Sequence, residues 1–167
     1  MSCVIRPARD ADTEAIAALH GDVVEHSLMT FTTLKRSLSD WQDDILGDPP
    51  LLVAEAEDGR FLGFASFASF RKGSGYAHTA EHSIYLTDAA RGQGVGRKLL
   101  TALEKQASDL GIHVLVAGIS GANPAAQGFH AACGYTEVGR MPQVGHKWGQ
   151  WLDLVLMQKI LREGSAP

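Results

Sequence analysis

The chain has 167 residues, of which 45% are hydrophobic and 20% are charged, as in ordinary globular domains. Its net charge of −4 argues against nucleic acid or an anionic membrane surface as the main partner. No apolar run approaches the ~18 residues that a membrane span needs, and no signal-peptide core is seen. We therefore expect a single cytoplasmic domain over residues 1–167, with a frayed tail at 163–167.

The N-terminal part predicts a strand followed by two helices. A short strand is expected at 4–6, and Asp10 or Asp12 then caps a helix. A second helix is expected at 34–46, because the pair Pro49–Pro50 follows it and stops helical structure. The apolar positions at helical spacing are Ile16, Leu19, Val23 and Val24 in the first helix, and Leu34, Leu38, Trp41 and Ile45 in the second.

Three strands are expected next. Residues 51–56 and 61–70 flank the turn at 57–60, which is a hairpin signal. After a glycine-containing loop at 71–76, residues 81–86 read as another strand. Its alternation places Glu81, Ser83 and Tyr85 on one face, and His82, Ile84 and Leu86 on the other.

The C-terminal half predicts helices and strands in alternation. A glycine-rich turn at 91–96 leads into a helix, and a buried strand is expected at 112–119. Asn123 as N-cap and Pro124 at the first helical position start another helix, which ends near Gly134. The apolar stripe of the first of these helices is Val95, Leu99, Leu103 and Leu110.

The chain closes with strands, the last expected at 151–157. The element order β-α-α-β-β-β-α-β-α-β-β combines consecutive strands with one strand–helix–strand unit. It predicts an α/β (α+β) fold with a mixed, mostly antiparallel sheet of about seven strands and helices on both faces.

Cysteine and histidine patterns do not predict a metal site. Cys3 and Cys133 form no C-x-x-C pair, so we expect reduced, structural thiols. Residues 78–82 match the H-x-x-E-H motif of zinc proteases, which requires a helix. Because this segment runs into the strand at 83–86, we expect His82 to point away from Glu81 and no metal to bind.

The glycine-rich turn predicts an anion site. Backbone N–H groups and the positive end of the helix dipole favour phosphate there. A Walker A loop would need Ser or Thr after Lys98, where the sequence has Leu99. The dinucleotide-binding motif G-x-G-x-x-G has one residue more than the glycine run at 92–96. Arg91, Gly94 and Gly96 instead match R/Q-x-x-G-x-G, the pyrophosphate loop of GNAT N-acetyltransferases.

The chain resembles the GNAT superfamily over nearly its whole length. Within it, the chain resembles the phosphinothricin and methionine sulfoximine acetyltransferase branch. The matching stretches are 79–86, 91–100, 123–135 and 141–154. The last stretch fits M-P-Q-V-G-x-K-[FW]-G-x-W-L-D-L, which few other acetyltransferases carry.

The resemblance implies acetyl-CoA as co-substrate and assigns residues to it. The backbone of Ile84, Tyr85 and Leu86 would hold the pantetheine arm like an added strand. Asn123 would contact the cofactor near the start of its helix. The pyrophosphate would lie on Gly92, Gln93, Gly94, Val95, Gly96 and Arg97.

The resemblance also assigns the chemistry. Glu81 matches the catalytic glutamate, and His130 lies where many relatives carry a tyrosine acid. An amine is mostly protonated at neutral pH, so a base must remove a proton, directly or through water. An unperturbed histidine titrates near neutrality, so the residue type at His130 suits an acid or a base. Substrate contacts are expected from Arg71, Lys72, Gly73 and Glu81, with Arg71 clamping a carboxylate.

We therefore expect transfer of acetyl to the amino group of a small L-amino acid analogue, giving detoxification or resistance. Methionine sulfoximine, methionine sulfone and phosphinothricin are the expected types. Alternatives are another amine, such as a protein N-terminus or polyamine, and a non-catalytic acyl-CoA sensor. The resemblance implies a homodimer. Trp148 and Trp151 suit the core or a subunit interface more than a substrate cage.

Overall fold

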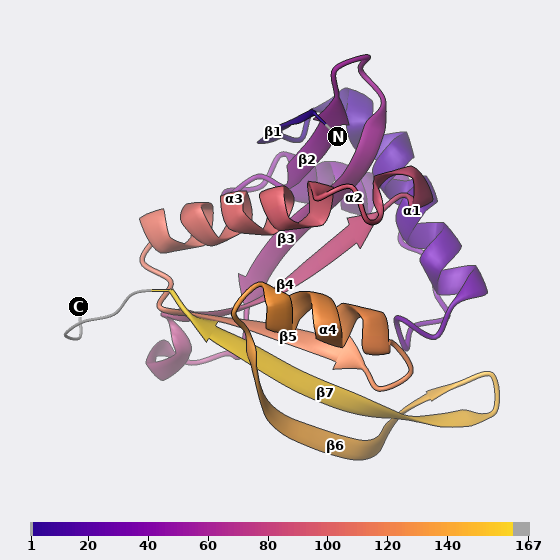
Figure 1. Ribbon diagram of the computed structural model, residues 1–167, viewed down its shortest axis with the longest axis vertical. Coiled ribbons are helices and arrows are strands. Elements are labelled where there is room, and N and C mark those ends of the chain that lie inside the picture. Colours follow the sequence, from indigo (N-terminus) through magenta and orange to yellow (C-terminus); the bar gives the residue numbers. More distant parts are fainter. Residues whose placement is uncertain (1, 162–167) are drawn as a thin grey trace. The chain divides into compact units, whose positions relative to one another are not determined.

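The computed structural model describes residues 2–161 (Figure 1). The α-helices are α1 (Thr13–His26), α2 (Leu38–Ile45), α3 (Val95–Asp109) and α4 (Pro124–Ala132). The strands are β1 (Cys3–Pro7), β2 (Leu52–Ala56), β3 (Phe61–Ser69), β4 (Thr79–Leu86), β5 (Val114–Ser120), β6 (Thr136–Lys147) and β7 (Gln150–Ile160). The predicted tail at 163–167 lies outside the described residues. No helix among residues 2–161 is long and apolar enough to span a membrane.

The strands form a seven-stranded sheet with the order β1-β2-β3-β4-β5-β7-β6. Strands β4 and β5 pair in parallel, whereas β1–β2, β2–β3, β5–β7 and β6–β7 are antiparallel. The prediction of a mixed, mostly antiparallel sheet is confirmed. The two closing strands of the predicted order are β6 and β7.

Helix boundaries differ from the predictions where a local cap decides them. The predicted start of the second helix at Leu34 is wrong, because Ser37 is the N-cap and its hydroxyl accepts from Asp40 N. The Asp40 carboxylate accepts in return from Ser37 N, which completes a capping box. Leu110 was expected on the buried stripe of α3, but it follows the helix end and is 54% exposed.

The chain divides into two compact units. Of the described residues, the first unit holds 2–27, 32–66 and 83–103, and the second holds 28–31, 67–82 and 104–161. The chain passes between the units within β3, within β4 and within α3. The single domain over residues 1–167 therefore stays a prediction.

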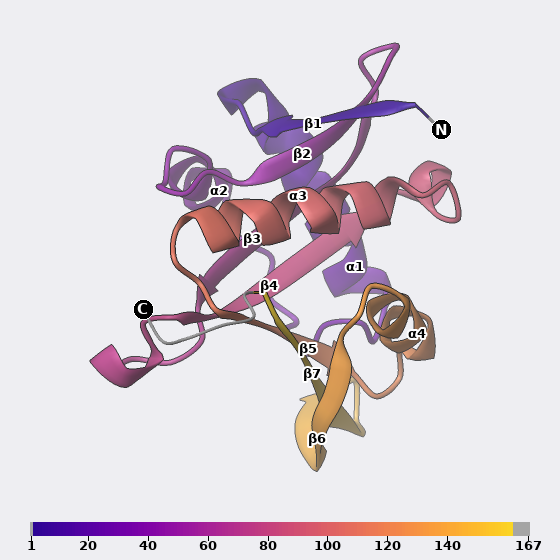
Figure 2. The same ribbon diagram turned by 60° about the vertical axis from the view of Figure 1, so that its left-hand side comes forward.

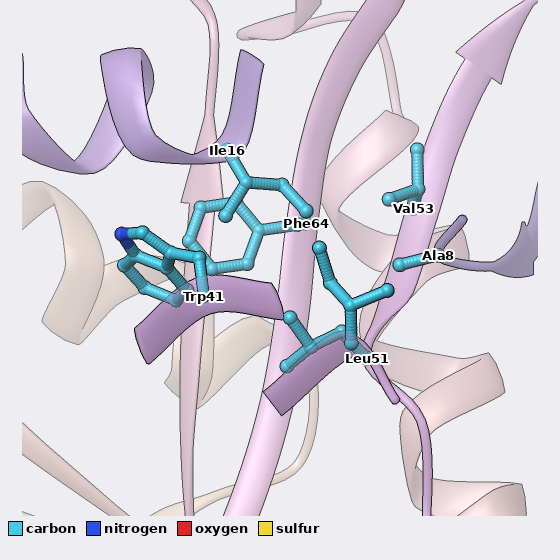
Figure 3. Close-up of a cluster of buried hydrophobic side chains, with 7 residues drawn as sticks. Ala8, Ile16, Trp41, Leu51, Val53 and Phe64 are labelled. Atoms are coloured by element: carbon cyan, nitrogen blue, oxygen red, sulfur yellow. The ribbon is translucent and has the colours of Figure 1, made fainter. Parts of the chain in front are cut away.

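The first unit has an apolar core cluster built from α1, α2, β2 and β3 (Figure 3). Trp41 of α2 meets Phe64 of β3 edge to face, with ring centroids 5.4 Å apart. Burying one such large side chain stabilises the fold by about 1.5–3 kcal/mol. The cluster consists of Ala8, Ile16, Trp41, Ile45, Leu51, Val53 and Phe64.

In the second unit, α4 packs on β5, β6 and β7 (Figure 2). Strands β6 and β7 form a long hairpin, several of whose large apolar side chains are exposed. Trp148 and Trp151 are 51% and 66% exposed, so of the two places expected for them the core is wrong and a subunit interface stays a prediction. Other exposed apolar residues of the hairpin are Val138, Met141, Val144 and Ile160.

The segment matching the zinc-protease motif is extended rather than helical. His82 and Glu81 both lie in β4, where neighbouring side chains point to opposite faces. His82 is buried and Glu81 is exposed, as the predicted alternation requires. The helical geometry on which H-x-x-E-H zinc binding depends is therefore not formed.

Candidate active site

Glu81 is held on β4 next to a strand position that has no side chain. Glu81 is paired with Val116 of β5, and Gly118 follows two residues later on the same face. A Cβ atom at Gly118 would lie 2.6 Å from Glu81 Oε1. The missing side chain therefore makes room for the carboxylate. Although Glu81 as a residue is exposed, neighbouring protein atoms partly desolvate its carboxylate and raise its pKa, which makes it a better proton acceptor.

The backbone of β4 changes its pairing along the strand. The parallel ladder to β5 covers Thr79–His82, and residues 84–86 lie outside it. On the β3 side, a Cβ atom at Gly63 would collide with the carbonyl oxygen of Tyr85, so only glycine permits this close approach. Residues 84–86, to which the resemblance assigns the pantetheine arm, thus lie beyond the ladder to β5.

The glycine-rich turn leads directly into α3. Gly92 and Gly94 have φ values of 70° and 78°, which L side chains rarely adopt. A Cβ atom at either position would meet nothing within 4 Å, so this exposed backbone lies open to a ligand. The first turn of α3, from Val95, brings N–H groups that have no intrahelical acceptor. This arrangement fits a pyrophosphate group.

Gln93 and Arg97 flank the same turn, and Val95 and Gly96 are buried beside them. Arg91 forms an exposed ion pair with Asp88, at 3.2 Å. Every residue expected to bind the pyrophosphate thus lies in the turn or the first turn of α3.

Asn123 caps α4. Its Oδ1 accepts from Ala126 N at 3.1 Å, and Pro124 occupies the first helical position. The predicted helix start is therefore confirmed. The cap uses the side-chain oxygen, which leaves the amide N–H₂ group as the donor through which Asn123 would contact a cofactor.

His130 lies against His82 within the second unit. The Nε2 atoms of the two imidazoles are 3.0 Å apart, and the side chains are only 4% and 5% exposed. His130 Nδ1 also lies 2.8 Å from the carbonyl oxygen of Ala126, one turn earlier in α4. Since His82 points away from the Glu81 face of β4, the structure brings His130 to His82 rather than to Glu81.

The predicted substrate residues lie in the loop between β3 and β4. Arg71, Lys72 and Gly73 are all exposed. The Arg71 guanidinium lies over the ring of Phe70, 5.3 Å from its centroid. Gly73 has a φ of 117°, which reserves this position for glycine.

A short segment between α1 and α2 is anchored on β6. Lys147 is 1% exposed, and its ammonium group donates to the carbonyl oxygen of Thr30 at 3.0 Å. The ring of Phe31 fills the space beside Gly145 that a side chain there would occupy. Gly145 and Lys147 of the M-P-Q-V-G-x-K run thus hold the segment around Thr30 and Phe31 in place.

Sequence reasoning did not assign roles to Gly118 and His82. Gly118 lies in a predicted buried strand, where an isolated glycine is a signal of close approach. His82 is adjacent to the predicted catalytic glutamate, and the only role that a sequence motif suggests for it is that of a zinc ligand in H-x-x-E-H. Nothing in a single sequence indicates that residues 82 and 130 meet.

Comparisons with known proteins agree with one another. The sequence model of the Acetyltransferase (GNAT) family matches residues 20–135. An L-amino acid N-acyltransferase of Escherichia coli is 40% identical, over 98% of this chain and 96% of its own. An L-methionine sulfoximine/L-methionine sulfone acetyltransferase of Pseudomonas aeruginosa is 40% identical, over 95% of this chain and 94% of its own. A phosphinothricin acetyltransferase of Sinorhizobium meliloti, whose structure was solved with acetyl-CoA, is 34% identical to this chain. The two structures superpose with a TM-score of 0.91, over 100% of this chain and 92% of the other.

Proposed function

The chain belongs to the acetyltransferase (GNAT) family, and on this premise we propose which amine it acetylates and which residues act. It is an N-acetyltransferase with acetyl-CoA as co-substrate. We propose that its acceptor is a small L-amino acid analogue of the methionine sulfoximine, methionine sulfone or phosphinothricin type. Acetylation would detoxify the analogue. The names of the relatives support this acceptor class.

The observation that carries the proposal is the construction of β4. This strand presents Glu81 beside Gly118 and leads directly into the open glycine turn before α3. Residues 84–86 would offer backbone groups to the pantetheine arm, and residues 92–97 would hold the pyrophosphate. Asn123 would add a contact through its amide group.

Glu81 is proposed as the general base. Acetyl-CoA supplies the acetyl group on an activated thioester, so the difficulty lies in freeing the amine of its proton. The carboxylate of Glu81 accepts that proton, directly or through a water molecule. Its raised pKa reduces the difference between the pKa of the carboxyl group and that of the amine. Arg71, with Lys72 and Gly73 in the same exposed loop, is proposed to clamp the acceptor's carboxylate.

His130 remains a predicted catalytic residue. Its Nδ1 lies within hydrogen-bond distance of the carbonyl oxygen of Ala126, and its Nε2 lies within hydrogen-bond distance of His82 Nε2. Proton transfer by His130 therefore requires the bond to His82 to open, or the proton to pass through it.

A homodimer formed through the β6–β7 hairpin is also proposed. The hairpin exposes six large apolar side chains, and exposed apolar patches often mark interfaces. The proposals that the enzyme works in the cytoplasm, without nucleic acid or membrane partners, rest on its composition and net charge of −4. Sedimentation would reveal a monomer if the dimer is wrong.

A thiol-release assay with acetyl-CoA tests the function. The panel consists of methionine sulfoximine, methionine sulfone, phosphinothricin, ordinary amino acids, a polyamine and a peptide N-terminus. We expect kcat/KM to be highest for the first three acceptors. Faster turnover of the polyamine or the peptide would contradict the acceptor class. Binding of coenzyme A without turnover of any amine would instead indicate a sensor.

A further inference from the structure

The histidine pair, His82 of β4 and His130 of α4, is a buried and hydrogen-bonded unit. The Nε2–Nε2 distance of 3.0 Å is that of a hydrogen bond, which needs a proton on one of the two atoms. Both imidazoles contact the ring of Tyr135, with centroids 5.3 Å away. His82 Nδ1 is buried and makes no hydrogen bond of normal length and angle, although a backbone interaction with Val116 raises the pKa of His82.

The protein backbone decides which way this hydrogen bond runs. A carbonyl oxygen only accepts, so the 2.8 Å contact with Ala126 places a proton on His130 Nδ1. A neutral imidazole carries one proton, so His130 Nε2 then has a lone pair. The donor is therefore His82 Nε2–H, and a lone pair remains on His82 Nδ1. Any other neutral arrangement would leave two lone pairs facing each other or leave the Ala126 contact without a proton.

The surroundings favour the uncharged pair. Burial lowers the pKa of His130 and lowers that of His82 to about 3. The titratable groups nearby are Tyr135, Glu104 and Cys133, with Lys159 behind them. Glu104 raises the pKa of His130, but burial outweighs it, and Lys159 pairs with Glu104 at 2.7 Å. On β5, His82 is paired with Ala117, and the backbone of the neighbouring Val116 raises the pKa of His82, but burial outweighs it.

We propose that His82 is a positioning residue for His130. By donating its Nε2 proton, it holds His130 as the neutral Nδ1–H tautomer and occupies the only lone pair of that ring. The assignment of this pair to acetyl transfer rests on the proposed function, whereas the tautomer itself does not.

The consequence is a division of roles between adjacent residues of β4. Glu81 remains available to the acceptor amine, while His82 keeps a second ionisable group uncharged on the other face of the strand. Loss of the donor at position 82 would free the lone pair of His130. His130 would then take up a proton at higher pH than in the native enzyme.

The tautomer is measured on the full-length protein labelled with ¹⁵N-histidine. Long-range ¹H–¹⁵N correlation at pH 7 distinguishes protonated from unprotonated ring nitrogens, and His130→Asn identifies the signals of His130. We expect a protonated Nδ1 and an unprotonated Nε2. A protonated Nε2 on His130 would overturn the proposal.

Two variants test the effect on the reaction. In His82→Leu the ring of His130 is expected to titrate about one pH unit higher, the shift that corresponds to losing one neutral hydrogen bond. The acid limb of its kcat/KM profile is expected to move in the same direction. His82→Gln keeps a donor near the Nε2 position, so it is expected to retain the native tautomer and profile.

The outcomes separate the two proposals. An unchanged His130 titration in His82→Leu overturns the positioning role, and an unchanged pH profile overturns the link to the reaction. If His82→Leu does not fold, the tautomer of His130 in the native protein and the pH profile of His82→Gln still test the positioning role. Absence of acetyl transfer by the native enzyme refutes the proposed function, while the tautomer measurement remains informative.

Discussion

The apolar core cluster of the first unit and the histidine pair of the second are both buried, but different forces fix them. Ile16, Phe64 and their neighbours lose contact with water and gain dispersion contacts, which any side chain of similar shape provides. His82 and His130 are held by directional hydrogen bonds in which each proton has a defined place.

Stability and chemistry therefore depend on different groups of buried residues. Burying an ionisable group costs free energy, and the histidine pair reduces that cost by remaining neutral. The apolar cluster carries no such cost. We therefore expect variants of the cluster to change mainly stability, and variants near the pair and Glu81 to change mainly activity or its dependence on pH.

The largest effect is expected for Glu81→Gln, which removes the proposed base. We expect kcat to fall by about 10²–10⁴-fold, the usual contribution of general base catalysis. Because Glu81 is exposed, the free energy of unfolding is expected to change little. Steady-state kinetics and urea unfolding measure the two quantities. A native rate in the variant would refute the assignment of Glu81.

Phe64→Ala is expected to have the largest effect on stability. It leaves a cavity in the apolar core cluster and is expected to lower the free energy of unfolding by about 3–5 kcal/mol. Leu34→Ala is the matched control, because Leu34 is 78% exposed and its loss is expected to cost less than about 0.5 kcal/mol. Equal losses in urea unfolding of the two variants would contradict the assigned core.

The pair predicts a pH dependence of stability that the cluster does not. His82 has a folded pKa of about 3 against an ordinary value of 6.5, so between these values only the unfolded chain binds its proton. Stability is therefore fully present above pH 6.5 and decreases as the pH falls, by up to ~1.4 kcal/mol per pH unit.

Urea unfolding between pH 6.5 and 4.5 measures this slope. His82→Leu is expected to reduce it, whereas Phe64→Leu is expected to lower stability by the same amount at each pH. A slope in His82→Leu equal to that of the native protein would contradict the buried, neutral state of His82. The remaining slope reports the other buried histidines, His20 and His130, whose pKa values burial also lowers.

The smallest effect is expected for Gly118→Ala. The new methyl group would lie 2.6 Å from Glu81 Oε1 and displace the carboxylate. We expect kcat to fall about tenfold, because small misplacements of catalytic groups are costly. Gly139→Ala, whose added carbon meets nothing within 4 Å, is the control and is expected to keep the native rate. Equal rates in the two variants would show that Gly118 does not make room for the base.

The sequence alone predicts the order of the strands and α-helices, the mixed and mostly antiparallel sheet, and the glycine-rich turn before α3. Local signals suffice for these, because the period of apolar residues, the Asn123–Pro124 helix start and the glycines of residues 92–96 act within a few residues of one another. The error at Leu34 arose because a capping box at Ser37 outweighs an apolar spacing.

The contacts of Glu81 and His130, in contrast, follow only from how the strands and helices pack. Gly118 approaches Glu81 from another strand, and His82 reaches His130 across 48 positions of sequence. Such contacts depend on the register of β4 against β5 and on the packing of α4 on the sheet. Period, caps and turns do not encode that register, because they describe each element alone and say nothing of which side chains meet when elements pack.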